Sequence, residues 1–188
     1  EQLQFSDALQ KLNGASFTRD FGGDGKSDIL LTRADGTVVM WQMNGGSVSI
    51  GSYPLAAGSG WSVVDSHGDY NGDGKSDMLI AKADGTLAMW LMNGSVVSQA
   101  QYLLSAGSGW NLLDGHGDFN GDGKSDILLT KADGTVAMWQ MNGGTVSSAA
   151  YPLAGGSGWT VFYFHGASNT EIYTLTLHAT LQISLAMW

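Results

Sequence analysis

The sequence predicts an all-β fold, and three observations lead to that prediction. Two series of tryptophans recur with one period of 49 residues, at Trp41, Trp90, Trp139 and Trp188, and at Trp61, Trp110 and Trp159. Each period holds short apolar runs that are separated by Gly, Asn and Asp turn signals. Within the repeat, no run has the apolar spacing of a helix. A fixed period of this length is typical of propellers, solenoids and other repeat arrays.

The elements of one repeat can be placed in order after an Asp-rich run at 69–77. The turn signals Asp84-Gly85 and Asn93-Gly94 separate successive apolar runs and predict hairpins. Four short strands in about 49 residues are typical of one blade of a β-propeller, so we expect a propeller-like array of about four blades, each of roughly four antiparallel strands. The predicted strands of this unit are 78–81, 86–92 and 96–104, with a further strand starting at 110–114.

We expect a single repeat domain over 1–188, and its two ends differ from the middle. Residues 173–187 alternate between apolar and polar side chains, which predicts an unusually long β segment. Because the repeat is interrupted in mid-blade at both ends, the N-terminal piece can either close a ring or complete a blade of another molecule. The predicted divisions are a partial unit 1–19, units 20–68, 69–117 and 118–166, and a degenerate partial unit 167–188.

The run Asp-Tyr-Asn-Gly-Asp-Gly-Lys-Ser-Asp at 69–77 recurs at 118–126 and, altered, at 20–28. Oxygen-bearing groups at alternate positions suit Ca²⁺, which takes six to eight oxygen ligands. Carboxylates this close together also repel one another unless a cation lies between them. The alternative, a plain Asn-Gly or Asp-Gly turn, does not need three carboxylates. The predicted Ca²⁺ ligands are Asp20, Asp24, Lys26 and Asp28; Asp69, Asn71, Asp73, Lys75 and Asp77; and Asp118, Asn120, Asp122, Lys124 and Asp126, each lysine through its carbonyl.

The first of these loops is expected to bind Ca²⁺ most weakly, because Gly22 stands where the other two loops have Asn. No tight metal site is expected at 167–175, where the acidic pattern is lost.

The string Gly-Asp-Phe-Asn-Gly-Asp-Gly-Lys-Ser-Asp-Ile-Leu-Leu at 117–129, followed by Asp133-Gly134 and Ala137-Met138-Trp139, resembles the FG-GAP/VCBS repeat family. The resemblance is strong over 69–166, good over 20–68 and absent from the ends. It implies β-propeller blades with a calcium ion in an inter-strand loop. It also implies an origin among the secreted bacterial proteins and integrin α-chains that carry such repeats.

Composition excludes some partners and indicates a compartment. The net charge is −9, and three bound Ca²⁺ would bring it to −3, so the acidity is assigned to metal binding. Eight Lys and Arg without a basic cluster make nucleic acid an unexpected partner. With no cysteine, no signal peptide and no membrane span, we expect a mature, secreted, extracellular protein, since loops of modest charge fill at millimolar calcium.

Two other repeated features are candidate sites. His67, His116 and His165 each stand two residues before an Asp-rich or equivalent segment, and we expect them to brace the loop by hydrogen bonding. Trp61, Trp110 and Trp159 follow Gly-Ser-Gly and are candidate ligand-binding residues, with core packing as the alternative. No nucleophile–base pair or zinc cluster stands out in the sequence, so an enzyme is not expected.

The predicted function is that of an extracellular structural or adhesive module that binds Ca²⁺ and assembles head-to-tail with copies of itself. One alternative is a carbohydrate-binding β-propeller lectin, whose partners would be extracellular glycans. A second alternative is a non-catalytic propeller attached to a larger secreted enzyme.

Overall fold

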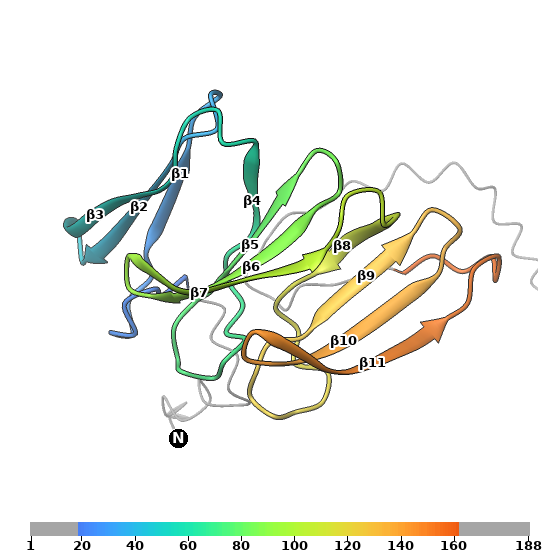
Figure 1. Ribbon diagram of the computed structural model, residues 1–188. Coiled ribbons are helices and arrows are strands. Elements are labelled where there is room, and N and C mark those ends of the chain that lie inside the picture. The colour runs from blue at the N-terminus through green and yellow to red at the C-terminus, as the bar shows by residue number, and fades with distance from the viewer. Residues whose placement is uncertain (1–18, 162–188) are drawn as a thin grey trace, which may run out of the picture.

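A computed structural model of the chain describes residues 19–161, which form an all-β structure (Figure 1). Eleven strands lie in this range and build three antiparallel sheets. The all-β prediction is confirmed. Between residues 19 and 161 no helix is long and apolar enough to cross a membrane. The predictions made for 1–18, His165 and 167–188 lie outside the described residues.

The strands pair in chain order within each sheet. Sheet A contains β1 (Ile29–Thr32), β2 (Val38–Asn44) and β3 (Ser47–Leu55). Sheet B contains β4 (Trp61–Asp65), β5 (Met78–Lys82), β6 (Leu87–Asn93) and β7 (Val96–Leu104). Sheet C contains β8 (Trp110–Asp114), β9 (Ile127–Lys131), β10 (Val136–Asn142) and β11 (Thr145–Leu153).

The sheets are shifted along the chain relative to the sequence units. Strand β8, which follows sheet B in the chain, pairs with β9 of sheet C, with Trp110 opposite Lys131. Sheets B and C therefore span 61–104 and 110–153, and the loops 69–77 and 118–126 each connect the first and second strands of their own sheet. This position anchors both ends of the loop in one hydrogen-bonded ladder.

The hairpin turns form as their sequences predict. In the β5–β6 turn, a carboxylate oxygen of Asp84 accepts a hydrogen bond from the backbone N–H of Thr86 at 2.9 Å. Gly85 has φ +88°, a left-handed conformation that glycine adopts without a steric penalty. The same Asp-Gly pair therefore turns the chain in each sheet.

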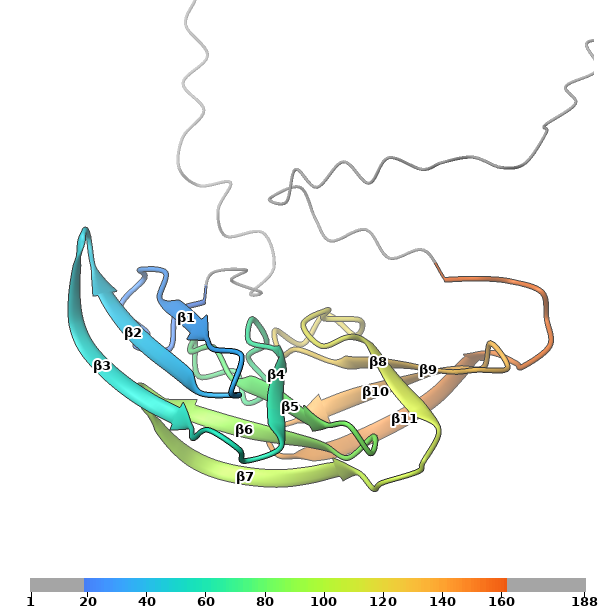
Figure 2. The same ribbon diagram turned by 90° about the horizontal axis from the view of Figure 1, so that it is seen from above.

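The core lies between the sheets, which follow one another side by side (Figures 1 and 2). Alternate residues of β5 serve the two faces of sheet B: Met78 and Ile80 pack in the cluster shared with sheet A, and Leu79 packs in the cluster shared with sheet C. A sheet that is covered on both faces needs apolar residues at successive positions. This explains why β5, the strand after the second Asp-rich loop, is a continuous apolar run.

Strand β1 lacks this cover. Ile29 and Leu31, which stand one period before Met78 and Ile80, are each 39% exposed, whereas Met78 and Ile80 are buried. Sheet A also has three strands among the described residues where sheets B and C have four. One edge of β1 is therefore unpaired within residues 19–161.

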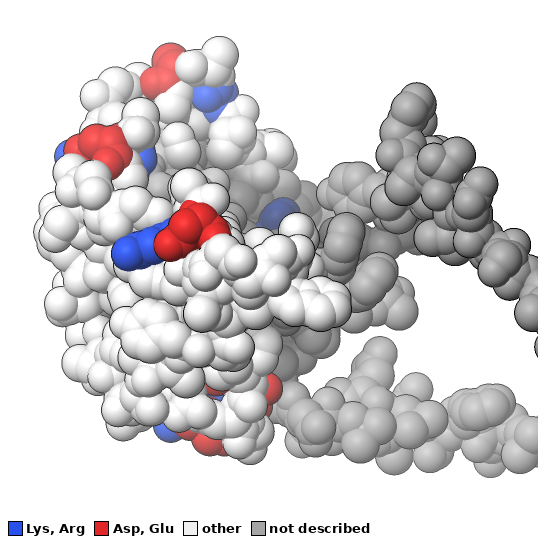
Figure 3. Space-filling model, turned by 90° about the vertical axis from the view of Figure 1, so that its right-hand side faces the viewer, with Lys and Arg blue, Asp and Glu red and all other residues white. Residues whose placement is uncertain are grey.

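Charged side chains are sparse on the surface that Figure 3 shows. On this face they stand in small groups in which acidic and basic residues adjoin, and no broad basic area is visible. The view agrees with a sequence that contains only eight Lys and Arg.

Candidate metal centre

The loop 69–77 is wound around the carboxylate of its first residue. The two carboxylate oxygens of Asp69 accept hydrogen bonds from the backbone N–H groups of Gly72 (2.7 Å), Asp73 (3.2 Å) and Gly74 (2.8 Å). Gly72 and Gly74 have φ of +74° and +81°, which lets the chain turn this tightly. The half-buried Asp69 carboxylate thus sits on the inner side of the loop.

The middle of the loop brings further side-chain oxygens together. The Asn71 side-chain oxygen accepts a hydrogen bond from the backbone N–H of Asp73 at 2.9 Å, and an Asp73 oxygen accepts one from the N–H of Lys75, also at 2.9 Å. The Asn71 amide donates to the other Asp73 oxygen at 3.2 Å. Oxygen groups from alternate residues therefore lie close to one another, as the spacing predicts.

Asp77, the last residue of the loop, also joins the loop to the sheet. It is fully buried, and its two carboxylate oxygens accept hydrogen bonds from the N–H groups of Tyr70 (2.9 Å) and Met92 (2.8 Å). Met92 lies in β6, so one carboxylate fixes both the start of the loop and a neighbouring strand. Sequence reasoning identified this residue only as a ligand. The equivalent bonds of the other loops join Asp28 to Phe21 and Met43, and Asp126 to Phe119 and Met141.

The carboxylates of one loop raise each other's pKa. Burial raises the pKa of Asp69, and the negative charge of Asp73 raises it further. Burial also raises the pKa of Asp77 to about 7, with the charges of Asp69 and Asp73 adding to the effect against two backbone hydrogen bonds. The pKa of Asp126 is raised for the same reasons. These residues fit a divalent cation, because its positive charge would offset both the cost of burying the carboxylates and their mutual repulsion.

In the first and third loops the lysine pairs with a loop carboxylate, although Lys124 Nζ lies farther from Asp122, at 3.8 Å. Lys26 Nζ lies 2.7 Å from a carboxylate oxygen of Asp24, and both side chains are about half exposed. In the second loop, Lys75 Nζ instead donates to the Asn93 side chain at 2.7 Å. The first loop therefore combines a missing Asn oxygen with an ammonium group on one of its carboxylates.

Consecutive loops are hydrogen-bonded to one another. Ser76 donates its N–H to the carbonyl of Asp20 at 2.7 Å, and the Asp20 N–H donates to the Ser76 hydroxyl at 3.0 Å. Ser125 makes the same reciprocal pair with Asp69, at 2.8 and 2.9 Å. The Ser before the last Asp thus links each loop to the first residue of the preceding loop.

The repeated histidine lies where sheets B and C meet. His116 Nδ1 lies 2.8 Å from a carboxylate oxygen of Asp65, which is the last residue of β4. Burial raises the pKa of Asp65, but the hydrogen bonds from His116 and His67 outweigh it and hold that pKa well below its usual range. Burial lowers the pKa of His116, and the Asp65 partner reverses this and raises it. The sequence predicted a bracing hydrogen bond for the histidine but did not identify Asp65 as its partner. Asp65 recurs one period later as Asp114, and this repetition could have indicated its role.

Two of the candidate tryptophans have matching surroundings. The ring centroids of Trp61 and Tyr102 are 6.0 Å apart with the rings tilted at 45°, and Lys82 Nζ lies 4.8 Å from the centre of the indole ring. Trp110 lies 6.2 Å from Tyr151, with Lys131 Nζ 4.6 Å from its ring. Trp61 and Trp110 are half-buried against the core, so packing accounts for part of each indole.

Trp110 and Trp159 also line cavities at the junctions between repeats. A cavity of about 410 Å³ lies between the β5–β6 hairpin and β8, and its lining includes Lys82, Gly85 and Trp110. A smaller cavity of about 230 Å³ has the equivalent residues Lys131, Gly134 and Trp159. Trp159 is 74% exposed. The structure therefore brings the second and third of the three candidate tryptophans to cavities that recur with the repeat.

Residues 118–165 match the family model of the FG-GAP-like repeat. The matched range begins at the third Asp-rich loop and contains β9, β10 and β11. The comparisons with curated proteins and with solved structures gave no match.

Proposed function

We propose that this chain, which belongs to the FG-GAP repeat family, is a calcium-stabilised β-propeller module that binds or scaffolds outside the cell and has no catalytic activity of its own. One observation carries the proposal. In the second and third loops, acidic side chains converge closely enough to raise one another's pKa, and the three loops are hydrogen-bonded in series. Such loops are strained by their own charge unless a cation is bound.

The residues that would hold Ca²⁺ in the second loop are the oxygens of Asp69, Asn71, Asp73 and Asp77, with the carbonyl of Lys75. The bound ion would neutralise the carboxylates and cross-link the loop. Because Asp77 also bonds Met92, ion binding and sheet packing would reinforce each other. The equivalent sets are Asp118, Asn120, Asp122, Lys124 and Asp126, and Asp20, Asp24, Lys26 and Asp28.

Calorimetric titration of the full chain with Ca²⁺ tests this assignment. We expect three ions per chain, with the weakest at 20–28. Asp73→Ala should remove one ion, because Asp73 supplies a loop oxygen and is itself exposed. Asp84→Ala is the matched control, since Asp84 is an exposed aspartate of a hairpin turn and should leave all three ions bound. A wild-type chain that binds no Ca²⁺, or an Asp73→Ala variant that keeps all three ions, would contradict the proposal.

The scaffold role that we propose includes self-assembly through the edge of β1 that is unpaired within residues 19–161. Exposed strand edges pair with other chains. Ile29 and Leu31 of β1 are also exposed, whereas the equivalent residues of sheets B and C are buried. A segment from another copy that added a strand beside β1 would pair this edge, giving a head-to-tail contact. Sedimentation of the full chain over a concentration series should show growing species, and a monomer at every concentration would exclude this part of the proposal.

A lectin is the second candidate function, and the recurring cavities favour it. Each is lined by a tryptophan, a lysine and a glycine, and an indole together with polar groups suits the binding of a sugar ring and its hydroxyls. Replacing both Trp110 and Trp159 by alanine should abolish binding on a glycan array, whereas Tyr53→Ala, which removes a 73% exposed aromatic side chain of sheet A, should preserve it. Absence of any glycan binding, with calcium or with chelator, would leave the scaffold as the only role.

A further inference from the structure

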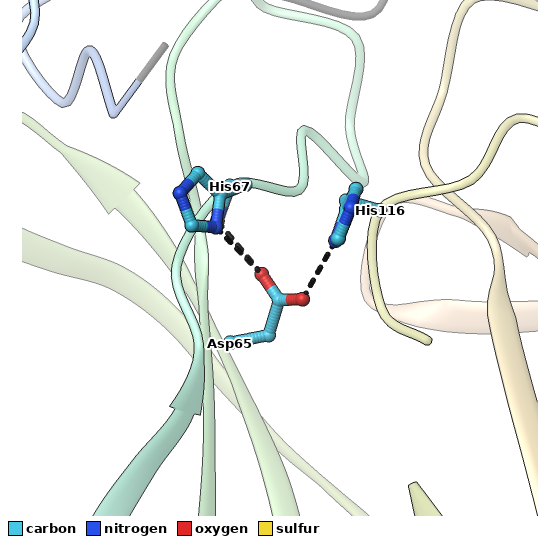
Figure 4. A group of neighbouring side chains, drawn as sticks. All are labelled: Asp65, His67 and His116. Carbon is cyan, nitrogen blue, oxygen red and sulfur yellow. Dashed lines mark hydrogen bonds and ion pairs between the residues drawn. The ribbon is translucent and has the colours of Figure 1, made fainter. Parts of the chain in front are cut away.

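The joint between sheets B and C contains four side chains that the Asp-rich loops do not use. Asp65 ends β4 and Asp114 ends β8, and a histidine follows each of them by two residues. The two pairs are one period apart, and the folding of consecutive sheets brings them together. Figure 4 shows His67 and His116 on the two sides of the Asp65 carboxylate.

The possible ligand atoms of this joint are already close. His116 Nδ1 lies 2.8 Å from one oxygen of Asp65 and 3.2 Å from Asp114 Oδ1. His67 Nδ1 lies 3.7 Å from the other Asp65 oxygen. Ligand atoms of Asp65, His67 and His116 all fall within 4.8 Å of one another.

Backbone groups orient both carboxylates toward the joint. Asp65 Oδ1 accepts a hydrogen bond from the N–H of His67 at 2.8 Å, and Asp114 Oδ2 accepts one from the N–H of Gly117 at 2.9 Å. Each carboxylate therefore has one oxygen held by its own turn and the other directed at His116. Outer hydrogen bonds of this kind hold the ligands of protein metal sites in position.

Asp114 Oδ1 is the independent sign that a cation belongs here. The Asp114 side chain is fully buried, and this oxygen has no hydrogen-bond partner. His116 Nδ1 forms an ion pair with this oxygen at 3.2 Å, but it carries at most one hydrogen and lies closer to Asp65, at 2.8 Å. A buried carboxylate oxygen with no donor is costly, so a positive charge at this point would be strongly favoured.

We propose that Asp65, His67, Asp114 and His116 form a binding site for one divalent transition-metal ion of the Zn²⁺ class, distinct from the Asp-rich loops. Two imidazole nitrogens and two carboxylate oxygens are a donor set for Zn²⁺ or Co²⁺, whereas Ca²⁺ takes oxygen ligands. The ion would take the place of the His116 Nδ1 proton and contact both carboxylates. His67, whose side chain is 32% exposed, lies on the side open to solvent.

The sequence limits such a site to one junction. One period before Asp65 and His67 stand Ser16 and Thr18, and one period after Asp114 stands Tyr163. The pairs of aspartate and histidine that would form the site therefore follow each other in sequence at this one junction. The expected stoichiometry is one transition-metal ion per chain, against three Ca²⁺ ions.

Titration of the Ca²⁺-saturated full chain with Co²⁺, followed by visible absorption and by calorimetry, tests the proposal. The wild type should bind one Co²⁺ with the intense absorption of a tetrahedral site, and Zn²⁺ should displace it. His67→Ala should weaken Co²⁺ binding at least tenfold and keep the far-ultraviolet circular dichroism of the wild type, since His67 is partly exposed. His178→Ala removes another of the four histidines of the chain and should bind Co²⁺ like the wild type.

Two results would overturn the proposal. One is a wild type that binds no Co²⁺ or Zn²⁺, which would make the joint a purely hydrogen-bonded contact. The other is a His67→Ala variant that binds the ion as tightly as the wild type, which would make the ion adventitious. Asp114→Asn is a second test, because it removes the charge of the Asp114 carboxylate with little change in shape and should also weaken Co²⁺ binding.

Discussion

Replacing Asp77 by alanine should destabilise the chain even without calcium. The Asp77 carboxylate accepts hydrogen bonds from the N–H groups of Tyr70 and Met92, in a fully buried position. Asp77→Ala leaves both donors without that acceptor, in a site that water does not reach. The variant therefore loses a structural link as well as a proposed calcium ligand.

The magnitude follows from the two donors. Each buried polar group left unsatisfied costs about 1–3 kcal/mol, so the free energy of unfolding should fall by about 2–6 kcal/mol. For a chain of this size, about 2–4 °C of melting temperature corresponds to each kcal/mol. Asp77→Asn keeps one acceptor oxygen and should lose about half as much.

Urea unfolding in EDTA and in calcium separates the two roles. Asp73→Ala is the matched variant, because Asp73 belongs to the same loop but is exposed. In EDTA, Asp73→Ala should stay within about 0.5 kcal/mol of the wild type while Asp77→Ala is clearly less stable. In calcium both variants should fall below the wild type. Equal stability of the two variants in EDTA would refute the structural role assigned to Asp77.

Three further changes test the contacts between repeats. Ser125→Ala removes the hydroxyl that accepts from the Asp69 N–H and should cost about 1–3 kcal/mol in urea unfolding; an unchanged midpoint would mean that this hydroxyl does not help to hold the two loops together. Gly68→Ala would place a Cβ 2.7 Å from a carbonyl oxygen of the next unit and should lower the free energy of unfolding by about 1–3 kcal/mol. Gly46→Ala is the control, because the space around Gly46 is open and the change should be nearly neutral. Similar costs at both sites would contradict the close packing at Gly68. Gly22→Asn restores the oxygen missing from the first loop and should tighten its calcium binding in calorimetry, and no gain would show that this oxygen is not a ligand.

Local features were predictable from the sequence because they depend on neighbouring residues. The third strand of the repeat was expected at 96–104, which is the observed extent of β7. Strands β5 and β6 differ from the expectation by one residue at their ends. The winding of the loop around Asp69 also follows from residues within five positions, where carboxylate and glycine spacing decide the geometry.

The remaining features depend on contacts between distant residues, which spacing does not reveal. Strand β8 could have paired within the preceding sheet, and only the ladder with β9 shows that it starts the next one. The partner of Asp77 in β6 is 15 residues away, and His116 is 51 residues from Asp65. A repeated residue indicates a repeated role, but the partner becomes visible only when consecutive sheets are packed together.

The most direct test of the calcium account is the thermal unfolding of the wild-type chain in calcium and in EDTA. Binding to the folded state alone stabilises it by about 2.7 kcal/mol per site when free Ca²⁺ exceeds Kd a hundredfold. One such site corresponds to a rise in Tm of about 5–10 °C. The account predicts a clearly higher Tm in calcium, with a further rise as calcium increases. Coincident melting curves in calcium and in EDTA would contradict it.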